Sequence, residues 1–217
     1  MNHTNTDAIE SPDEQVSTFA AKFSHDTMTP SATATLPTRF GDFRVLGFEH
    51  DNTEYAVLVR GDVAHQDNIP VRLHSECFTG DVMGSLRCDC RDQLELALET
   101  IGTNERGVVV YLPQEGRGIG LINKIKAYAL QDQGMDTVEA NHALGFPDDL
   151  RTYGCAAEIL KALDVQSVEL LSNNPSKRRG LEMHGMTVNR MRPIRTPTNP
   201  HNSDYISTKR EKCGHLI

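Results

Sequence analysis

The chain has 217 residues, enough for one well-buried domain and marginal for two, and its 38% hydrophobic and 24% charged residues fit a soluble globular protein. Its formal net charge of −8 argues against a general nucleic-acid binder, which is normally basic, but is compatible with a phosphorylated small molecule bound at a local positive patch. The longest apolar run, residues 108–112, is strand-sized, and the N-terminus lacks the pattern of a signal peptide, so we expect neither a membrane span nor secretion.

Composition divides the chain into three parts. Residues 1–35 are rich in Thr, Ser, Asp and Pro with few large apolar side chains, which predicts a flexible N-terminal tail. Residues 36–195 carry the apolar patterns of a single domain, and residues 196–217 read as a C-terminal tail without a core pattern. Five cysteines, an odd number with three of them clustered, argue against a disulfide framework and favour a reducing, cytoplasmic location.

The first part of the domain is predicted to consist of β-strands. Residues 43–48 and 55–60 are apolar and β-prone, and a turn-forming Asp-Asn pair between them favours an antiparallel hairpin. Residues 71–73 are predicted to form a further strand that delivers His74 and Cys77 to a site.

A helix is predicted to end at Gly102, because the apolar residues before it recur with the spacing i, i+3, i+4 and i+7. Residues 107–112 then read as a buried strand, followed by a glycine-rich loop at 114–120 and a helix over 121–133. A loop between a strand and a helix can aim backbone N–H groups at an anion, although many such glycine runs are only tight turns. Arg117 within the loop favours a contact with phosphate or base.

Helices and strands continue to alternate towards the C-terminus. A helix with one apolar face is predicted around residues 156–163, then a strand at 168–171, a polar turn, a short helix at 177–184 and a strand at 187–193. The polar turn ends at Lys177, so it offers a second place to hold a phosphate. This alternation predicts a single α/β domain with a mixed sheet and flanking helices.

Cys77, Cys88 and Cys90 place three soft thiolates within fourteen residues, which is typical of zinc. Tetrahedral zinc needs four ligands, so two interpretations stay open: a structural site closed by His74 or a distant residue, or a catalytic site whose fourth position is left to water. The H-x-E run that begins at His74 also matches zinc deaminases, but the P-C-x-x-C that follows in those enzymes is absent here, which excludes that class.

Over its whole length, the stretch from residue 72 to residue 120 resembles GTP cyclohydrolase II, the enzyme that opens riboflavin biosynthesis. The resemblance is carried by RLHSEC at 72–77, TGD at 79–81, SLRCDC at 85–90 and QEGR at 114–117, and it extends over residues 36–216. It implies a mixed α/β fold, a homodimer, and conversion of GTP and water into formate, pyrophosphate and 2,5-diamino-6-ribosylamino-4(3H)-pyrimidinone 5′-phosphate. It also implies one Zn²⁺ per chain and Mg²⁺ bound with the substrate triphosphate.

The resemblance assigns roles to individual residues as well. Zinc would be held by the three cysteines and would activate water for attack on the imidazole ring. Asp149 is implied as proton acceptor, Arg151 as nucleophile and Tyr128 as a further catalytic residue. Contacts to GTP are implied for Arg72, Leu73, His74, Ser75, Glu76, Gln93, Glu115, Gly116, Arg117, Thr137, Ser172 and Lys177.

Residue chemistry alone favours plainer interpretations of several positions. Tyr128 lies on an otherwise apolar helix face, where most tyrosines are core residues. Asp149 and Arg151 lie two apart near a helix start, as solvated charges often do. A guanidinium with a pKa above about 12 is a poor nucleophile, so Arg151 is open to a second role, the stabilisation of charge on the α-phosphate. Lys124, like most lysines, reads as an ordinary surface charge.

Two positions depart from the family pattern. Pro113 stands where arginine usually precedes QEGR, which removes a cation near the substrate, and Ser172 replaces threonine while keeping the hydroxyl. Two alternatives stay open: a paralogue that stops at a formylated product or uses another purine nucleotide, and a non-enzymatic, zinc-stabilised dimer that binds nucleotides.

Overall fold

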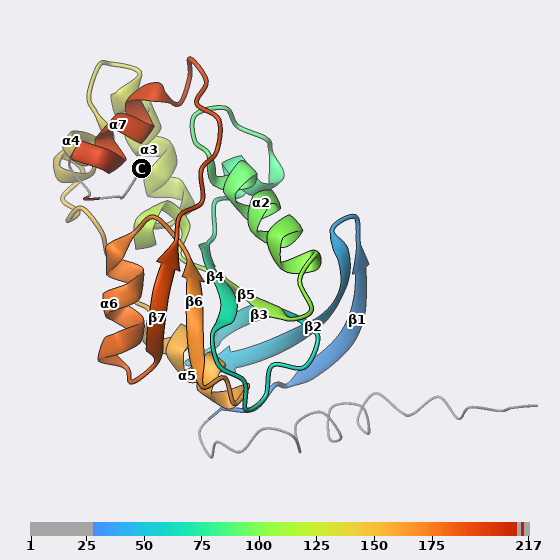
Figure 1. The fold of residues 1–217 in the computed structure, drawn as a ribbon. Coiled ribbons are helices and arrows are strands. Elements are labelled where there is room, and N and C mark those ends of the chain that lie inside the picture. Colours follow the sequence, from blue (N-terminus) through green and yellow to red (C-terminus); the bar gives the residue numbers. More distant parts are fainter. Residues whose placement is uncertain (1–27, 212–213, 215–217) are drawn as a thin grey trace, which may run out of the picture.

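The computed structural model describes residues 28–211 and residue 214. At its centre is a seven-stranded sheet with the order β1-β2-β3-β5-β4-β6-β7 (Figure 1). Pairing is antiparallel from β1 to β5 in that order and parallel from β5 to β7, so the expected mixed α/β fold is confirmed. The strands are β1 (Ala32–Thr38), β2 (Gly41–His50), β3 (Thr53–Arg60), β4 (Ile69–Ser75), β5 (Gly107–Leu112), β6 (Ser167–Leu171) and β7 (Thr187–Arg192).

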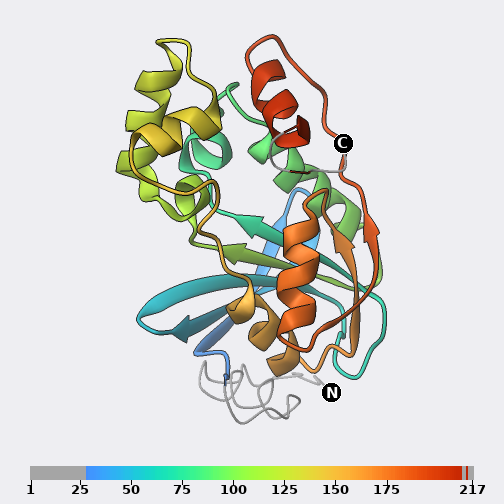
Figure 2. The same ribbon diagram turned by 90° about the vertical axis from the view of Figure 1, so that its left-hand side faces the viewer.

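Helices cover both faces of the sheet and one of its ends. In Figures 1 and 2, α2 lies on one face, α5 and α6 lie on the other, and α3, α4 and α7 gather beyond the carboxyl ends of the parallel strands. Among the described residues, no helix combines the length and the apolar character needed to cross a lipid bilayer. The helical elements are η1 (Phe78–Val82), α2 (Cys90–Gly102), η2 (Glu115–Gly118), α3 (Gly120–Gln131), α4 (Thr137–Ala143), α5 (Gly154–Ala162), α6 (Pro175–Met183) and α7 (Ser203–Glu211).

The predicted hairpin is formed by β2 and β3, and its turn explains its register. Asp51 and Asn52 adopt positive φ angles of 50° and 57°, the left-handed conformation that a two-residue type I′ turn requires at both central positions. Asn and Asp tolerate this conformation better than other residues with a side chain. The turn therefore sets His50 opposite Thr53 and fixes the pairing of the whole hairpin.

The core lies on both faces of the sheet, as β5 shows. Val108 and Val110 are fully buried in the cluster that β5 shares with α5 and α6, whereas Val109 points to the opposite face and packs with Ile101 of α2. Side chains alternate between the two faces of a strand, so a strand covered on both sides needs an apolar residue at every position. This is why the sequence of β5 is an uninterrupted apolar run.

Both ends of the described chain are more structured than composition suggested. β1 begins at Ala32, so the last four residues of the expected 1–35 tail belong to the sheet, and Met28 packs into the main core with only 7% of its surface exposed. Residues 1–27 lie outside the described part. In the expected 196–217 tail, α7 forms and buries Ile206 and Lys209. A nine-residue, largely polar helix gives too little apolar periodicity to be recognised in the sequence.

Candidate active site

The candidate site lies where three parallel strands end. Cys77 follows β4, the loop to Glu115 follows β5, and Ser172 follows β6, so the three chain segments leave the sheet at the same edge. Ligands of open α/β sheets bind outside the carboxyl ends of the strands, because the loops there converge on one crevice. A cavity at this edge is bounded by α3 on one side and α7 on another.

The cavity brings together all but three of the residues that the sequence singled out. Leu73, His74 and Asp149 do not line it. Residues without a predicted role also face the cavity, among them Lys124, Tyr205 and Lys209. The predicted residues that line it are Arg72, Ser75, Glu76, Cys77, Cys88, Cys90, Gln93, Glu115, Gly116, Arg117, Tyr128, Thr137, Arg151, Ser172 and Lys177.

The three cysteines meet at one wall of this cavity. Their sulfur atoms all lie within 4.8 Å of one another, and the Cys77 and Cys88 sulfurs are 3.7 Å apart. Gly80, in the single turn η1, passes beneath them so closely that an added Cβ would lie 2.8 Å from Cys88 Sγ. Three convergent sulfurs with a glycine beneath them fit a soft metal ion such as zinc.

His74 does not belong to this cluster. Among the described residues, the group of possible metal ligands here comprises the three cysteines alone. His74 Nε2 instead lies 3.1 Å from both carboxylate oxygens of Asp81. Within the described residues, the interpretation of a structural zinc site closed by His74 is therefore wrong, whereas closure by a distant residue and an open fourth position both stay predictions.

Lys124 of α3 contacts the cysteine cluster directly. Its ammonium lies 3.0 Å from Cys77 Sγ and 2.8 Å from Glu115 Oε1, and only 11% of its side chain is exposed. Hydrogen bonds from the Cys88 and Cys90 thiols, together with this ammonium, hold the pKa of the Cys77 thiol well below its ordinary value. Lys124 is thus a buried partner of a thiolate, so the expectation of an ordinary surface charge is wrong.

Glu115 connects the glycine loop to the turn that carries Cys77. Its carboxylate accepts hydrogen bonds from the backbone N–H groups of Phe78 and Gly116, at 2.6 and 2.8 Å. In the loop itself, Gly116 and Arg117 have φ angles of 62° and 63°, so the chain turns with two successive left-handed residues. This conformation, with the Glu115 anchor, directs Arg117 towards the cavity.

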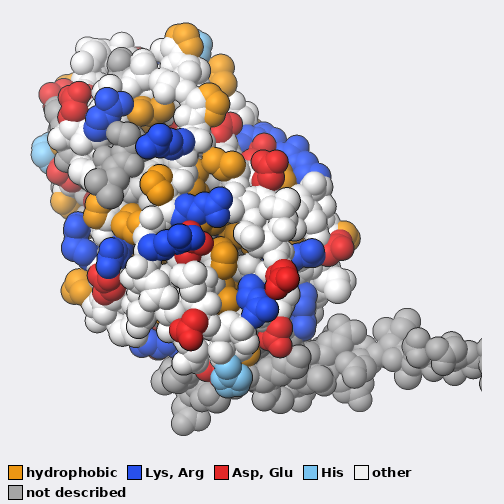
Figure 3. All heavy atoms as spheres, in the orientation of Figure 1, with side chains coloured by type: hydrophobic (Ala, Val, Ile, Leu, Met, Phe, Trp, Pro, Cys, Tyr) orange, Lys and Arg blue, Asp and Glu red, His pale blue; other side chains and the backbone are white. Residues whose placement is uncertain are grey.

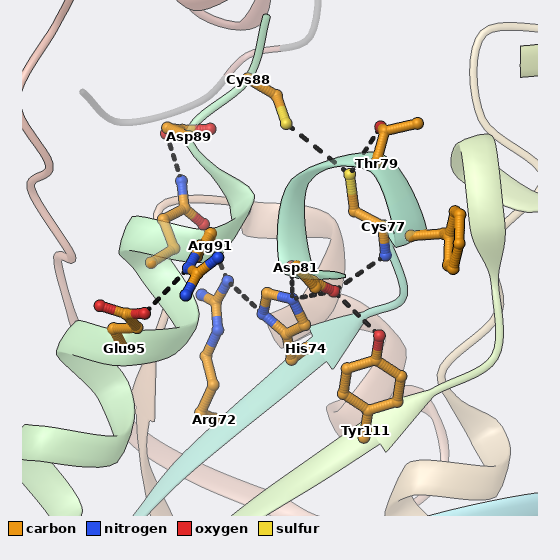
Figure 4. Close-up of polar contacts among 12 residues, drawn as sticks. Arg72, His74, Cys77, Thr79, Asp81, Cys88, Asp89, Arg91, Glu95 and Tyr111 are labelled. Atoms are coloured by element: carbon orange, nitrogen blue, oxygen red, sulfur yellow. Dashed lines mark hydrogen bonds and ion pairs between the residues drawn. The ribbon is translucent and has the colours of Figure 1, made fainter. Parts of the chain in front are cut away.

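A buried polar row lies under the turn η1 (Figure 4). His74 stands between Arg72 and Asp81, and Asp81 also accepts hydrogen bonds from the Tyr111 hydroxyl at 2.9 Å and from the Cys77 backbone N–H at 3.0 Å. Burial lowers the pKa of His74 to about 4, even though the hydrogen bond to Asp81 opposes this shift. A neutral His74 therefore supports the carboxylate that fixes the backbone of Cys77.

Tyr128 faces the cysteines from α3. Its hydroxyl lies 3.2 Å from Thr79 Oγ1, and the guanidinium of Arg87 covers its ring at 4.9 Å from the centroid. Burial raises the pKa of the Tyr128 hydroxyl, so the group stays protonated at neutral pH. The side chain is partly exposed to the cavity, so Tyr128 is a wall residue of the cavity and not one of the core tyrosines that an apolar helix face favours.

Asp149 and Arg151 form a fork in the segment that precedes α5. Arg151 Nε donates to Asp149 Oδ1 at 2.8 Å and its terminal nitrogen donates to Oδ2 at 2.6 Å. Burial alone would lower the pKa of the Arg151 guanidinium, but the hydrogen bonds and charge of Asp149 outweigh burial and raise it. Asp149 holds Arg151 at the cavity edge in its charged form.

Two further cations are buried with neutral partners. Arg72 donates to the Leu171 carbonyl and the Gln93 amide, at 3.0 and 2.8 Å, and Lys177 donates to the Leu73 carbonyl at 2.6 Å. Burial lowers the pKa of Arg72 to about 10 and that of Lys177 well below its ordinary value. Leu73 thus contributes its carbonyl rather than its side chain. Cations buried against neutral groups are costly, so this part of the cavity favours an anion.

The surface and the cavity differ in charge. Lys and Arg side chains are interspersed with Asp and Glu over the face shown in Figure 3, as the net charge of −8 would suggest. The cavity lining, in contrast, gathers a set of cations: Arg72, Arg87, Arg117, Lys124, Arg151, Lys177 and Lys209. Pro113, at the position that departs from the family pattern, is exposed and does not line the cavity.

Comparison with known proteins shows the family to which the chain is related. The family model for GTP cyclohydrolase II matches residues 29–193. A GTP cyclohydrolase-2 of Picrophilus torridus is 51% identical over 185 residues, which cover 85% of this chain and 96% of that protein. Proteins named riboflavin biosynthesis protein RibBA from Endomicrobium trichonymphae and Bacillus subtilis are 51% and 54% identical over 84% of this chain, which spans 46% and 47% of their lengths. The chain belongs to the GTP cyclohydrolase II family.

Proposed function

We propose that this protein hydrolyses the imidazole ring of GTP, releasing formate and pyrophosphate and yielding 2,5-diamino-6-ribosylamino-4(3H)-pyrimidinone 5′-phosphate for riboflavin biosynthesis. The observation that carries the proposal is the pairing, within one cavity, of a three-cysteine cluster with a group of buried cations. The cysteine cluster suits metal-assisted hydrolysis, and the buried cations suit the binding of a triphosphate. Family membership and the names of the relatives agree with this assignment.

Zinc is the metal that best suits Cys77, Cys88 and Cys90. When bound, it would supply Lewis-acid activation of the water that opens the ring. Lys124 keeps Cys77 ready to bind, because its ammonium stabilises the thiolate. Cys88→Ser should lose both the metal and formate release, and elemental analysis that finds no zinc in active wild-type protein would refute this part of the proposal.

The chain's own residues divide the remaining work between the two ends of the nucleotide. Tyr128, whose protonated hydroxyl lies beside Thr79 in the same cavity as the cysteines, would donate a proton during ring opening. Arg72, Arg151 and Lys177 are placed to bind phosphate oxygens, with Mg²⁺ as the further counter-charge on the triphosphate. Because Asp149 raises the pKa of Arg151, charge stabilisation at the α-phosphate suits Arg151 better than nucleophilic attack.

We further propose that the protein acts in the cytoplasm as a homodimer. Large apolar side chains are exposed on α3 and at the end of η1, with 51–67% of their surface accessible: Ile122, Ile125, Val82 and Met83. Exposed apolar residues that gather on neighbouring elements favour association. Light scattering coupled to size-exclusion chromatography tests the dimer, and a monomer at micromolar concentration would contradict it.

The decisive experiment is product analysis after incubation with GTP. Equal release of formate and pyrophosphate, with the diaminopyrimidinone identified by mass spectrometry, is the expected result. Retention of the formyl group, or turnover of another purine nucleotide instead of GTP, would point to the paralogue. Tight nucleotide binding without any product would indicate a non-enzymatic binding protein.

A further inference from the structure

Helix α7 is attached to the metal-binding segment by a buried ion pair. Lys209 Nζ lies 2.6 Å from Asp89 Oδ1, with 8% and 5% of the two side chains exposed. Asp89 stands between Cys88 and Cys90, and its other oxygen accepts hydrogen bonds from Gln93 Nε2 and from Thr196 Oγ1, the latter on the segment that leads to α7. Two residues of the C-terminal segment, Thr196 and Lys209, thus bind Asp89, which lies between two cysteines of the cluster.

The same helix presents a second side chain to the cavity. Tyr205 lies one helical turn before Lys209, whose ammonium covers the Tyr205 ring at 4.2 Å from the centroid. Both side chains line the cavity that contains Cys90, Arg117 and the other site residues. Figures 1 and 2 show α7 beyond the carboxyl ends of the parallel strands, at the same end of the sheet as α3 and α4.

The energetics make the docking of α7 depend on few contacts. A nine-residue helix is too short to be stable alone, and α7 buries little apolar surface beyond Ile206. Removing Lys209 would leave Asp89 as a buried charge without its main partner, which is strongly unfavourable. The Lys209–Asp89 pair is therefore a positioning contact for the helix.

We propose that α7 is a wall of the substrate pocket, in which Tyr205 stacks against the guanine nucleotide and Lys209 positions the helix through Asp89. This inference rests on the proposed function for the identity of the ligand. An aromatic ring at the cavity surface suits a flat purine, and Arg117, which lines the same cavity, adds a cation for the nucleotide. Neither residue had a predicted role.

Steady-state kinetics of full-length variants test the proposal. Tyr205→Ala should raise the KM for GTP by about tenfold, as loss of a base–aromatic stack does, with zinc content unchanged. Tyr205→Phe keeps the ring and should stay close to wild type. Lys209→Met should raise KM as well, whereas Arg210→Met, an exposed change on the next residue of the same helix, should have no effect.

Hydrogen–deuterium exchange gives a readout that does not require turnover. Binding of α,β-methylene GTP should slow amide exchange in the peptide that spans residues 203–211 of the wild type, and Tyr205→Ala should abolish that protection. An active wild type with unprotected α7 and an unchanged KM in Tyr205→Ala would overturn the inference about α7 alone. A wild type that protects α7 on binding the analogue but releases no formate from GTP would overturn the proposed function alone, and absence of nucleotide binding would overturn both.

Discussion

Tyr128 and Arg151 face the same cavity from different elements. Tyr128 stands on α3 beside the cysteines, and Arg151 stands in the segment before α5, forked to Asp149. The ring-opening and pyrophosphate-releasing steps act on different atoms of GTP. Cavity residues that come from different elements are therefore expected to affect the two products differently.

This separation predicts opposite product patterns for two variants. Tyr128→Phe removes the hydroxyl but keeps the ring under Arg87, so formate release should fall at least about tenfold while the fold survives. Arg151→Lys keeps a charge but loses the planar fork to Asp149, so pyrophosphate release should fall while partial activity persists. Formate and pyrophosphate would be assayed separately. Equal loss of both products in both variants would show that the steps are coupled.

His74 makes stability depend on pH. Its pKa falls from an ordinary 6.5 to about 4, mainly because burial disfavours the charged form and also because Arg72 and Lys177 are nearby, whereas Asp81 opposes the shift. The folded state thus binds fewer protons than the unfolded state between these values, so the stabilising contribution is complete above pH 6.5 and is lost as pH falls towards 4. The contribution amounts to at most about 3 kcal/mol.

His74→Gln tests this pH dependence of stability, because the glutamine amide does not titrate and remains a neutral donor to Asp81. Unfolding by denaturant at several pH values should give a shallower loss of stability for the variant than for wild type between pH 6.5 and 4. Parallel curves for the two proteins would show that His74 does not titrate in this way.

Most residues of the site could be predicted from the sequence one by one. The geometry of a β-strand explains why a predicted residue such as Leu73 does not reach the cavity. Five consecutive residues from Arg72 to Glu76 resemble the family motif, but side chains on a strand alternate between faces, so they cannot all reach one cavity. Leu73 accordingly faces the core. The sequence could have identified Lys124 as a site residue, because it lies four residues before Tyr128 and so shares the same face of the helix.

At the scale of elements, η1 is shaped by its closeness to the cysteines. A Cβ at Gly80 would lie 2.8 Å from Cys88 Sγ and 3.0 Å from Cys77 Sγ, so Gly80→Ala should force the sulfurs apart and reduce zinc content at least about tenfold. Gly47→Ala is the matched control, because nothing lies within 4 Å of an added Cβ in that strand. Zinc would be measured by elemental analysis after dialysis against a weak chelator. Full zinc occupancy in Gly80→Ala would mean that the turn can shift without cost.

The elements with a clear apolar pattern were predicted well whatever their length, whereas α4 and α7 were not predicted. β5 and α2 carry unambiguous apolar patterns, because each packs against a broad core. α4 has only seven residues, yet Asp136 and Glu139 form a capping box whose spacing could have marked its start. α7 offers no comparable signal, since a buried ion pair holds it rather than an apolar face.

For the whole molecule, the core begins earlier in the chain than composition suggested. Met28 packs among the core residues at 7% exposure, so Met28→Ala should reduce the free energy of unfolding by about 2–5 kcal/mol. Met183→Ala, at a position that is 82% exposed, should change it by less than about 0.5 kcal/mol. Denaturant unfolding of both variants is the measurement. Equal stabilities would place Met28 outside the cooperative core.

The fold class followed from the alternation of strands and helices, but the order of strands in the sheet did not. β5 lies between β3 and β4, pairing antiparallel with one and parallel with the other. Such pairings join residues far apart in the chain, so local patterns do not contain them. The same holds for the cavity, whose walls come from β4, from the segments that follow β5 and β6, and from helices as distant in the chain as α2, α3 and α7.

The ion pair between Lys209 and Asp89 joins residues 120 positions apart, and α7 follows every strand of the sheet in the chain. During synthesis, all seven strands can therefore emerge and pair before the residues that close the cavity have been translated. We expect a nascent chain arrested before residue 203 to hold a nearly complete sheet around an open crevice. The docking of α7, which closes the crevice, is then the last step of folding. A chain that ends before residue 203 should therefore fold but lack a closed cavity.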